Sequence, residues 1–168
     1  MNAAEFYREI YKIISDATPI GVDCGQLCKC ACCEGDDETG MYLFPGEKKL
    51  YAGDSGWFEI MKSEFCYVTH GKSIFTDLFV CKKFCDMEKR PLGCRIFPLL
   101  PYVSISGELS VILDPRGRGL CPLTVMELTD LDSDFCRRIE RVGKILMKFD
   151  ATREFLYALS RLADEYRF

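Results

Sequence analysis

The feature that most restricts what this chain can fold into is the stretch DCGQLCKCACCEGD, residues 23–36, which places five cysteines within ten positions. Thiols at this density have three explanations, which are disulfide bonds, burial as small apolar side chains, and metal ligation. Burial fits poorly, because these cysteines stand among glycine, glutamine, lysine and acidic residues and not on an apolar stripe. The stretch therefore favours a disulfide framework or a metal site.

The rest of the sequence argues against disulfides. Eleven cysteines is an odd number, so complete pairing within one chain is impossible. Charged residues such as Glu5 and Lys12 interrupt the apolar N-terminus, and nowhere does the chain offer the ~18 uncharged apolar residues of a membrane span. We therefore expect a cytoplasmic protein, whose thiols are kept reduced and whose clustered cysteines favour metal ligation over a redox disulfide.

Composition and charge set the remaining limits. The 168 residues, of which 48% are hydrophobic and 29% charged, are enough for one domain with its own core. Lysine and arginine number 22 against 26 aspartate and glutamate, a net charge of −4, so nothing indicates a nucleic-acid or membrane partner. We expect a single domain over residues 1–168, and the only partner that the sequence indicates is a metal ion.

Hydrophobic periodicity predicts both helices and strands. Phe6, Ile10 and Ile14 fall on one face of a helix over residues 3–16. Residues 102–114 alternate around Ser106-Gly107 and predict a β-hairpin. Helical spacing of apolar residues after Leu131 predicts two C-terminal helices that pack antiparallel. Shorter elements are also expected, namely strands over 41–44, 57–61 and 65–70 and one or two helical turns after Pro45.

These elements predict an α+β fold. The domain would have an N-terminal helix, cysteine-rich metal-centred loops with a small antiparallel sheet over about 23–123, and a C-terminal helical layer over about 130–166. No internal repeat or linker divides the chain.

A second set of clustered cysteines lies far along the chain, in VCKKFCDMEKRPLGCRIFPLLPY and DPRGRGLCPL. Cys81 and Cys85 repeat the three-residue gap between Cys24 and Cys28. Paired thiols at short spacing can present two ligands to one ion, and ligands from a distant segment then cross-link the fold. Glycines near the later cysteines leave backbone N–H groups free to face a thiolate. Arg90 and Arg95 either offset the thiolate charge or are ordinary surface charges.

Together these motifs resemble the cysteine-cluster proteins of the YkgJ-like family. The resemblance rests on C-x3-C-x3-C-C at 24–33, C-x3-C at 81–85, RPLGCRIFP at 90–98 and a late Cys-Pro at 121–122. It covers roughly residues 23–123 and implies a zinc- or iron-chelating domain. The eight ligands that it implies are Cys24, Cys28, Cys32, Cys33, Cys81, Cys85, Cys94 and Cys121. The chain departs from the family pattern in the gap before the double cysteine, which has three residues instead of two and contains the extra Cys30.

Two metals fit such ligands. Zinc takes four thiolates in a closed tetrahedral site, and an iron–sulfur cluster also takes four cysteines. We favour zinc in a structural or chelating and regulatory role, because no electron-transfer domain or G-x-G-x-x-G motif accompanies the cysteines. The alternative is an iron–sulfur redox or methyl-transfer enzyme, since the resemblance extends to flagellin lysine methylases, which share the cluster in a larger chain. The sequence itself supplies no substrate.

The remaining candidate residues carry weaker signals. His70 is the only histidine, which excludes H-E-x-x-H zinc proteases and leaves a single imidazole for any nucleophile. Cys66 stands at C-x3-H spacing from it, but Cys66 and Cys136 are isolated and are expected in the core. In extended chain adjacent side chains point apart, so Cys32 and Cys33 are expected to serve different ions. The eight thiols would then form two four-cysteine sites, each with ligands from residues 23–36 and completed by thiols from the 81–121 region.

Overall fold

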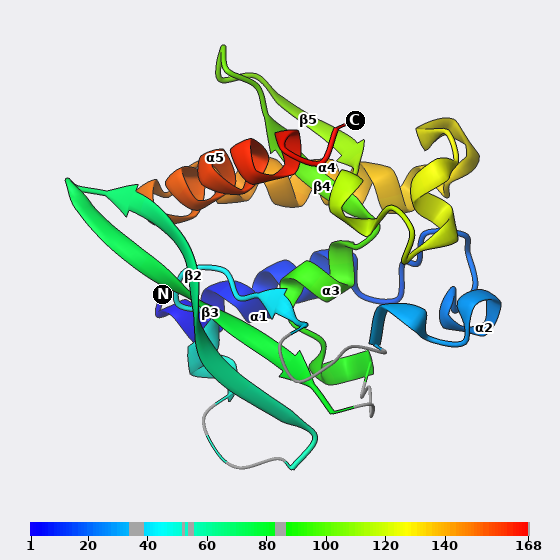
Figure 1. Ribbon diagram of the computed structural model, residues 1–168, viewed down its shortest axis with the longest axis horizontal. Helices are drawn as coiled ribbons and strands as arrows, with labels where there is room; N and C mark the ends of the chain where they lie inside the picture. The colour runs from blue at the N-terminus through cyan, green and yellow to red at the C-terminus, as the bar shows by residue number, and fades with distance from the viewer. Residues whose placement is uncertain (34–38, 52, 54–55, 83–86, 168) are drawn as a thin grey trace.

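The N-terminal helix, α1 (Ala3–Ile14), leads the chain into the cysteine-rich segment (Figure 1). It begins with a capping box, in which the Asn2 side chain accepts the N–H of Glu5 and the Glu5 carboxylate accepts that of Asn2. The helix confirms the prediction over 3–16 and ends two residues earlier. The structure is a computed structural model that describes residues 1–33, 39–51, 53, 56–82 and 87–167.

A three-stranded antiparallel sheet follows, with strand order β1-β3-β2. Its strands are β1 (Met41–Tyr42), β2 (Phe58–Thr69) and β3 (Lys72–Cys81). β2 unites the two predicted strands at 57–61 and 65–70, with an irregularity in its register between Lys62 and Cys66. The central strand β3 was not predicted. His70 and Gly71 join β2 to β3 with positive φ angles of 49° and 72°, the combination that a type I′ hairpin turn requires.

The second sheet is the predicted hairpin. It consists of β4 (Leu99–Val103) and β5 (Leu109–Leu113) and directly follows the short helix α3 (Leu92–Ile96). The turn between the two strands contains Gly107, which has a φ of 87°. β4 starts three residues before the predicted hairpin. Cys94 lies in α3, the helix that leads into this sheet.

Two C-terminal helices complete the domain and run in opposite directions, as predicted (Figure 1). α4 (Ser133–Leu146) packs against β4, β5 and α1, whereas α5 (Asp150–Asp164) packs against β2 and β4. The inward face of α4 is fully buried and includes Phe135, Ile139 and Val142. The helices therefore cover both sheets, and the α+β single-domain prediction is confirmed. In the described part of the chain no helix has the length and apolar character to cross a membrane.

Candidate metal centre

Four of the predicted ligands line one cavity of about 120 Å³, which we call the thiol cavity. They are Cys32, Cys33, Cys81 and Cys94. They reach the cavity from three separate parts of the chain, which are the 3-10 helix η1 (Ala31–Cys33), the last residue of β3 and the middle of α3. The fold thus brings together thiols that are up to 62 positions apart in sequence, from Cys32 to Cys94.

The rest of the cavity wall is mainly apolar. It includes Met41, Trp57, Phe79, Pro91, Phe97 and Leu120, with the Arg90 side chain as its charged member. Gly93 packs closely against Met41, since a Cβ at this position would lie 2.4 Å from Met41 Cγ unless that side chain moved. A hydrophobic wall limits the access of water and strengthens the attraction between a thiolate and a cation. The wall therefore provides surroundings that suit a metal thiolate.

The thiols do not form a ligand shell as they stand. Across the described residues, no three His, Cys, Asp or Glu side chains are grouped closely enough to hold a metal ion. A zinc site needs sulfur atoms about 2.3 Å from the ion. The thiol cavity consequently has the donor set of a soft-metal site, and binding would require its side chains to close on the ion.

Three further predicted ligands form a second group, made of Cys24, Cys28 and Cys121. Cys24 precedes the first turn of α2 (Gly25–Cys28), Cys28 ends that turn, and Cys121 is buried ahead of the 3-10 helix η5 (Pro122–Val125). Burial raises the pKa of the Cys24 thiol, and the negative charges of Cys121 and Cys28 raise it further. These three thiols are therefore close enough to repel one another when ionised, which is the situation that a cation relieves.

The loop around Cys121 holds its sulfur among backbone donors. Burial raises the pKa of Cys121, whereas hydrogen bonds from the backbone N–H groups of Leu123 and Thr124 lower it. The predicted donation from backbone to a thiolate is thus present at Cys121, but from the residues after it and not from the glycines before it. Gly117 has a packing role, since a Cβ there would lie 2.7 Å from the Phe97 ring.

A left-handed turn separates the two thiol groups along the chain. Lys29 and Cys30 are consecutive non-glycine residues with φ angles of 53° and 59°. The cysteines before this turn belong to the second group and those after it line the thiol cavity. Cys30 itself is exposed, and its Sγ atom lies 3.8 Å from the backbone oxygen of Gly25. Residues 24–33 therefore contribute thiols to both groups.

The assignment of Cys32 and Cys33 differs from the prediction of one cysteine for each site. Both line the thiol cavity. The reason is local, because the prediction assumed extended chain and these residues lie in η1 instead. In a 3-10 helix successive side chains are about 120° apart, since three residues make a turn, and two neighbours can therefore border one space.

Arg90 and Arg95 have different surroundings. Arg90 lines the thiol cavity, and its charge also lowers the pKa of Cys24, so it lies between the two thiol groups. The Arg95 guanidinium donates from Nε to the Arg90 carbonyl at 2.7 Å and from Nη2 to the Glu88 carbonyl, and it stacks 4.1 Å above the Tyr11 ring. Arg95 therefore fixes the backbone that carries Arg90.

This contact predicts a metal-retention phenotype for Arg95. Replacement by alanine releases the 88–90 backbone, so bound metal should pass to a chelator about tenfold faster than from wild type, as for other residues that orient ligands. Arg137→Ala is the matched control, since Arg137 lies on the exposed face of α4 and pairs with Asp134. Release can be followed with a colorimetric chelator. Equal rates for the two variants would assign Arg95 to the ordinary surface charges.

Glu47 is a buried acid that the sequence analysis missed. It is 0% exposed and accepts three hydrogen bonds, from the Tyr11 hydroxyl at 2.5 Å, the Leu92 N–H at 2.6 Å and the Phe44 N–H at 2.9 Å. Burial raises the pKa of Glu47, and the three donors and the nearby Arg95 oppose that shift. Because Leu92 is the first residue of α3, this carboxylate ties α1 to the helix that bears Cys94.

The remaining candidates lie away from both groups or outside the described residues. Cys85 falls in the segment 83–86, which the structure does not describe. His70 is exposed in the β2–β3 turn, with Nε2 3.8 Å from Asp150 Oδ2. Cys66 is paired opposite Phe75 in the first sheet, and the half-buried Cys136 packs against the hydrophobic core.

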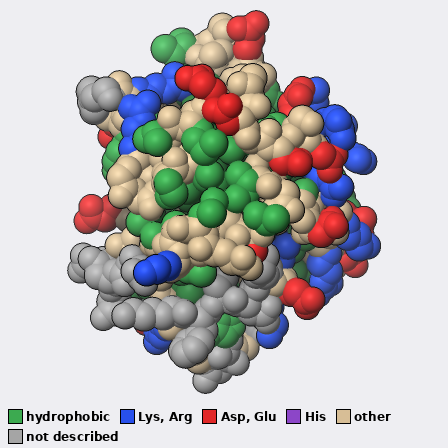
Figure 2. Space-filling model, turned by 90° about the vertical axis from the view of Figure 1, so that its right-hand side faces the viewer, with side chains coloured by type: hydrophobic (Ala, Val, Ile, Leu, Met, Phe, Trp, Pro, Cys, Tyr) green, Lys and Arg blue, Asp and Glu red, His purple; other side chains and the backbone are tan. Residues whose placement is uncertain are grey.

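The second thiol group lies on a side of the molecule with apolar surface. Figure 2 views the side that carries α2, and hydrophobic side chains, cysteine included, gather in the middle of this face. The segments that bear these thiols also bear Leu27 and Val125, which are 64% and 77% exposed. Comparison of the chain with protein-family models, curated proteins and solved structures finds no match.

Proposed function

We propose that this chain is a cytoplasmic metal-binding protein whose cysteines hold zinc in a structural or regulatory role. The observation that carries the proposal is the gathering of seven described candidate thiols into two groups, each of which combines thiols of residues 24–33 with thiols from later in the chain. Thiols that served only as small apolar side chains would lie within the core, whereas of these seven only Cys121 is buried. The resemblance of these motifs to the YkgJ-like family supports the same function.

The residues fit the group that they would hold. Soft thiolate donors select zinc, copper(I) or iron–sulfur clusters and not the hard cations magnesium and calcium. Arg90 offsets part of the negative charge that four thiolates carry, and Leu123 and Thr124 direct backbone N–H groups at Cys121. When bound, zinc would stabilise the fold by cross-linking the segments that supply its ligands.

The size of the thiol cavity supports an iron–sulfur cluster as the alternative to zinc. A single ion occupies little space beyond its ligands, whereas an iron–sulfur cluster needs room for several atoms between them. A cavity of about 120 Å³ that four cysteines and apolar side chains line has such room. The second candidate function is therefore an iron–sulfur protein with redox or methyl-transfer chemistry, as the resemblance to flagellin lysine methylases suggests.

Elemental analysis distinguishes the two proposals. Protein purified without oxygen should be colourless and contain zinc, because zinc thiolates do not absorb visible light. Iron and acid-labile sulfide at cluster stoichiometry, together with a brown colour, would establish the alternative. A protein that contains neither metal, and that binds neither zinc nor a reconstituted cluster, would contradict the metal-binding function itself.

A further inference from the structure

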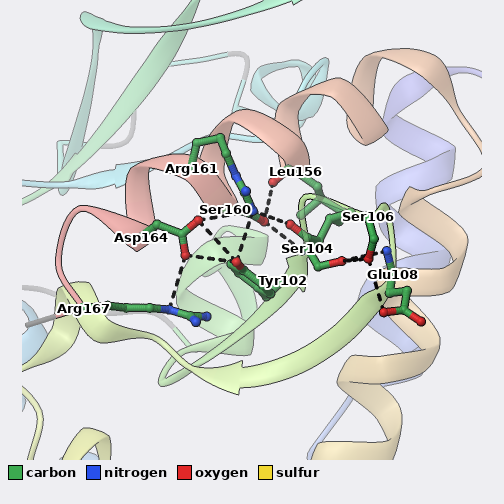
Figure 3. Close-up of polar contacts among 10 residues, drawn as sticks. Tyr102, Ser104, Ser106, Glu108, Leu156, Ser160, Arg161, Asp164 and Arg167 are labelled. Atoms are coloured by element: carbon green, nitrogen blue, oxygen red, sulfur yellow. Dashed lines mark hydrogen bonds and ion pairs between the residues drawn. The ribbon is translucent and has the colours of Figure 1, made fainter.

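The outer edges of β4 and β5 differ in the hydrogen-bond partners of their main-chain groups. The outer edge of β4 is covered by α5, as Figure 3 shows. There the Ser160 hydroxyl accepts the N–H of Val103 at 2.9 Å, and Arg161 Nη2 donates to the Val103 carbonyl at 2.6 Å. The Tyr102 hydroxyl also donates to Asp164 at 3.0 Å. Side chains of α5 thus satisfy the outward N–H and C=O groups of Val103.

The outer edge of β5 has no such partners. Hydrogen bonds from Ser104 N–H to Glu108 and from Asp114 N–H to Pro98 fix the ladder at its two ends. With the register of the hairpin, they direct the N–H and C=O groups of Leu109, Val111 and Leu113 away from β4. Within the described residues, no hydrogen bond reaches these outward groups. The edge therefore offers a row of main-chain donors and acceptors.

An open groove of about 740 Å³ runs beside this edge. Its lining includes Leu109 and Val111 of β5, together with Leu128 and Leu131 from the segment before α4 and Cys136 from α4 itself. The charged members of its lining, Arg137 and Glu140, already pair with Asp134 and Lys144 on their own helix. The groove consequently suits uncharged side chains that alternate along an extended backbone.

β5 also lacks the features that keep a free edge from pairing. The free edge of β2 carries Glu59, Lys62 and Glu64 and a register irregularity, which are common protections against added strands. The sequence of β5 is LSVIL, with no charge and no proline, and its register with β4 is regular. Of these two edges, only β5 is built so that another strand can join it.

We propose that the β5 edge binds an extended segment of another protein as a third strand of the hairpin sheet, with uncharged apolar residues at alternate positions facing the groove. A second copy of this chain fits less well. Antiparallel pairing of two β5 strands about Val111 would place Glu108 opposite the acidic Asp114 of the other copy, and opposed like charges are destabilising. This inference is independent of the metal.

A labelled peptide with alternating valines, SVTVSVTK, provides the probe. It should bind the full chain with a dissociation constant below about 1 mM. It should also slow amide hydrogen exchange at Leu109, Val111 and Leu113, since these N–H groups would become donors to the peptide. Val111→Pro removes one outward donor without removing a hairpin hydrogen bond, and should weaken binding about fivefold or more. Val111→Thr keeps the N–H group and should bind like wild type.

Peptide chemistry gives a test that does not depend on how Val111→Pro folds. An added strand uses only one of its two edges, so N-methylation of the valines and N-methylation of the alternate residues should have unequal effects on binding to wild type. Equal binding of both methylated peptides would show docking through side chains and overturn the proposal. Failure of the unmodified peptide to bind, or dimers of the protein that already protect the three amides, would overturn it as well.

Discussion

Glu47→Ala is expected to lower the free energy of unfolding by about 3–5 kcal/mol, a large part of the ~5–15 kcal/mol of a typical domain. The substitution removes the acceptor of the Tyr11 hydroxyl and of the Leu92 and Phe44 N–H groups, all of which meet a carboxylate that is 0% exposed. Buried donors without acceptors retain the full cost of leaving water. Urea unfolding followed by circular dichroism, in chelator, measures this loss without a contribution from metal.

Two variants control for this result. Glu140→Ala removes an exposed acid that pairs with Lys144 one turn away, and should cost no more than about 0.5 kcal/mol. Glu47→Gln keeps the size of the side chain but turns an amide N–H₂ toward one of the three donors, so its loss should lie between the other two. A Glu47→Ala protein as stable as Glu140→Ala would mean that water replaces the carboxylate. The three hydrogen bonds to Glu47 would then not stabilise the fold.

Cys94→Ser is expected to lower the bound metal and to destabilise the whole domain. Cys94 sits in α3, where it borders the thiol cavity together with cysteines from η1 and β3. Structural zinc can contribute roughly 10 kcal/mol or more per ion, because the site forms only when the chain folds. Removal of one of four ligands should therefore shift the melting curve far more than a change in core packing. Metal per chain and thermal unfolding, measured on the same samples, check both parts.

Cys136→Ser is the matched control for Cys94→Ser. This thiol is half-buried on α4 and packs against the core, away from the thiol cavity. Its loss should leave the metal content unchanged and cost only a small packing increment. Intact metal in Cys94→Ser would reject Cys94 as a ligand. The wild type should contain two metal centres, and a single centre per chain would reject the division into two sites.

The elements that sequence predicted are those with strong local signals. α1 has apolar residues at helical spacing and a capping box, and α4 and α5 have the same spacing over fourteen and fifteen residues. The hairpin alternates regularly around a glycine turn. In each case the local pattern and the burial in the fold agree, which is the condition under which a single sequence is informative.

Strand β3 escaped prediction because its pattern is irregular. Apolar residues occur in two groups, Ile74-Phe75 and Leu78 to Val80, on either side of a polar pair, so they do not alternate. The turn before it is His-Gly and not the Asn-Gly or Asp-Gly that signals a tight hairpin. The strand is nevertheless central, because it pairs with β1 on one side and β2 on the other. Its identity depends on those neighbours.

The candidate site shows the same limit at the level of residues. Spacing and the family resemblance named the candidate thiols, but their division into groups depends on which segments the fold brings together. Glu47 stands in PGEKK, where it has the appearance of a surface charge. The only hint of a buried partner was the pair of tyrosines, Tyr7 and Tyr11, on α1, whose hydroxyl groups need acceptors when the helix packs.

The handedness of the turn at Lys29 and Cys30 has a consequence for the choice of amino acids in the cysteine-rich segment. Left-handed backbone costs roughly 1–2 kcal/mol for each residue with a side chain, and glycine avoids this cost. Yet the glycine that precedes this turn is Gly25, where a Cβ would come within 2.9 Å of the Cys30 sulfur. The permissive residue is thus placed where it makes room for sulfur and not where the chain must bend. The turn itself is formed by Lys29 and Cys30, so the chain bears the cost of left-handed backbone at two residues that have side chains.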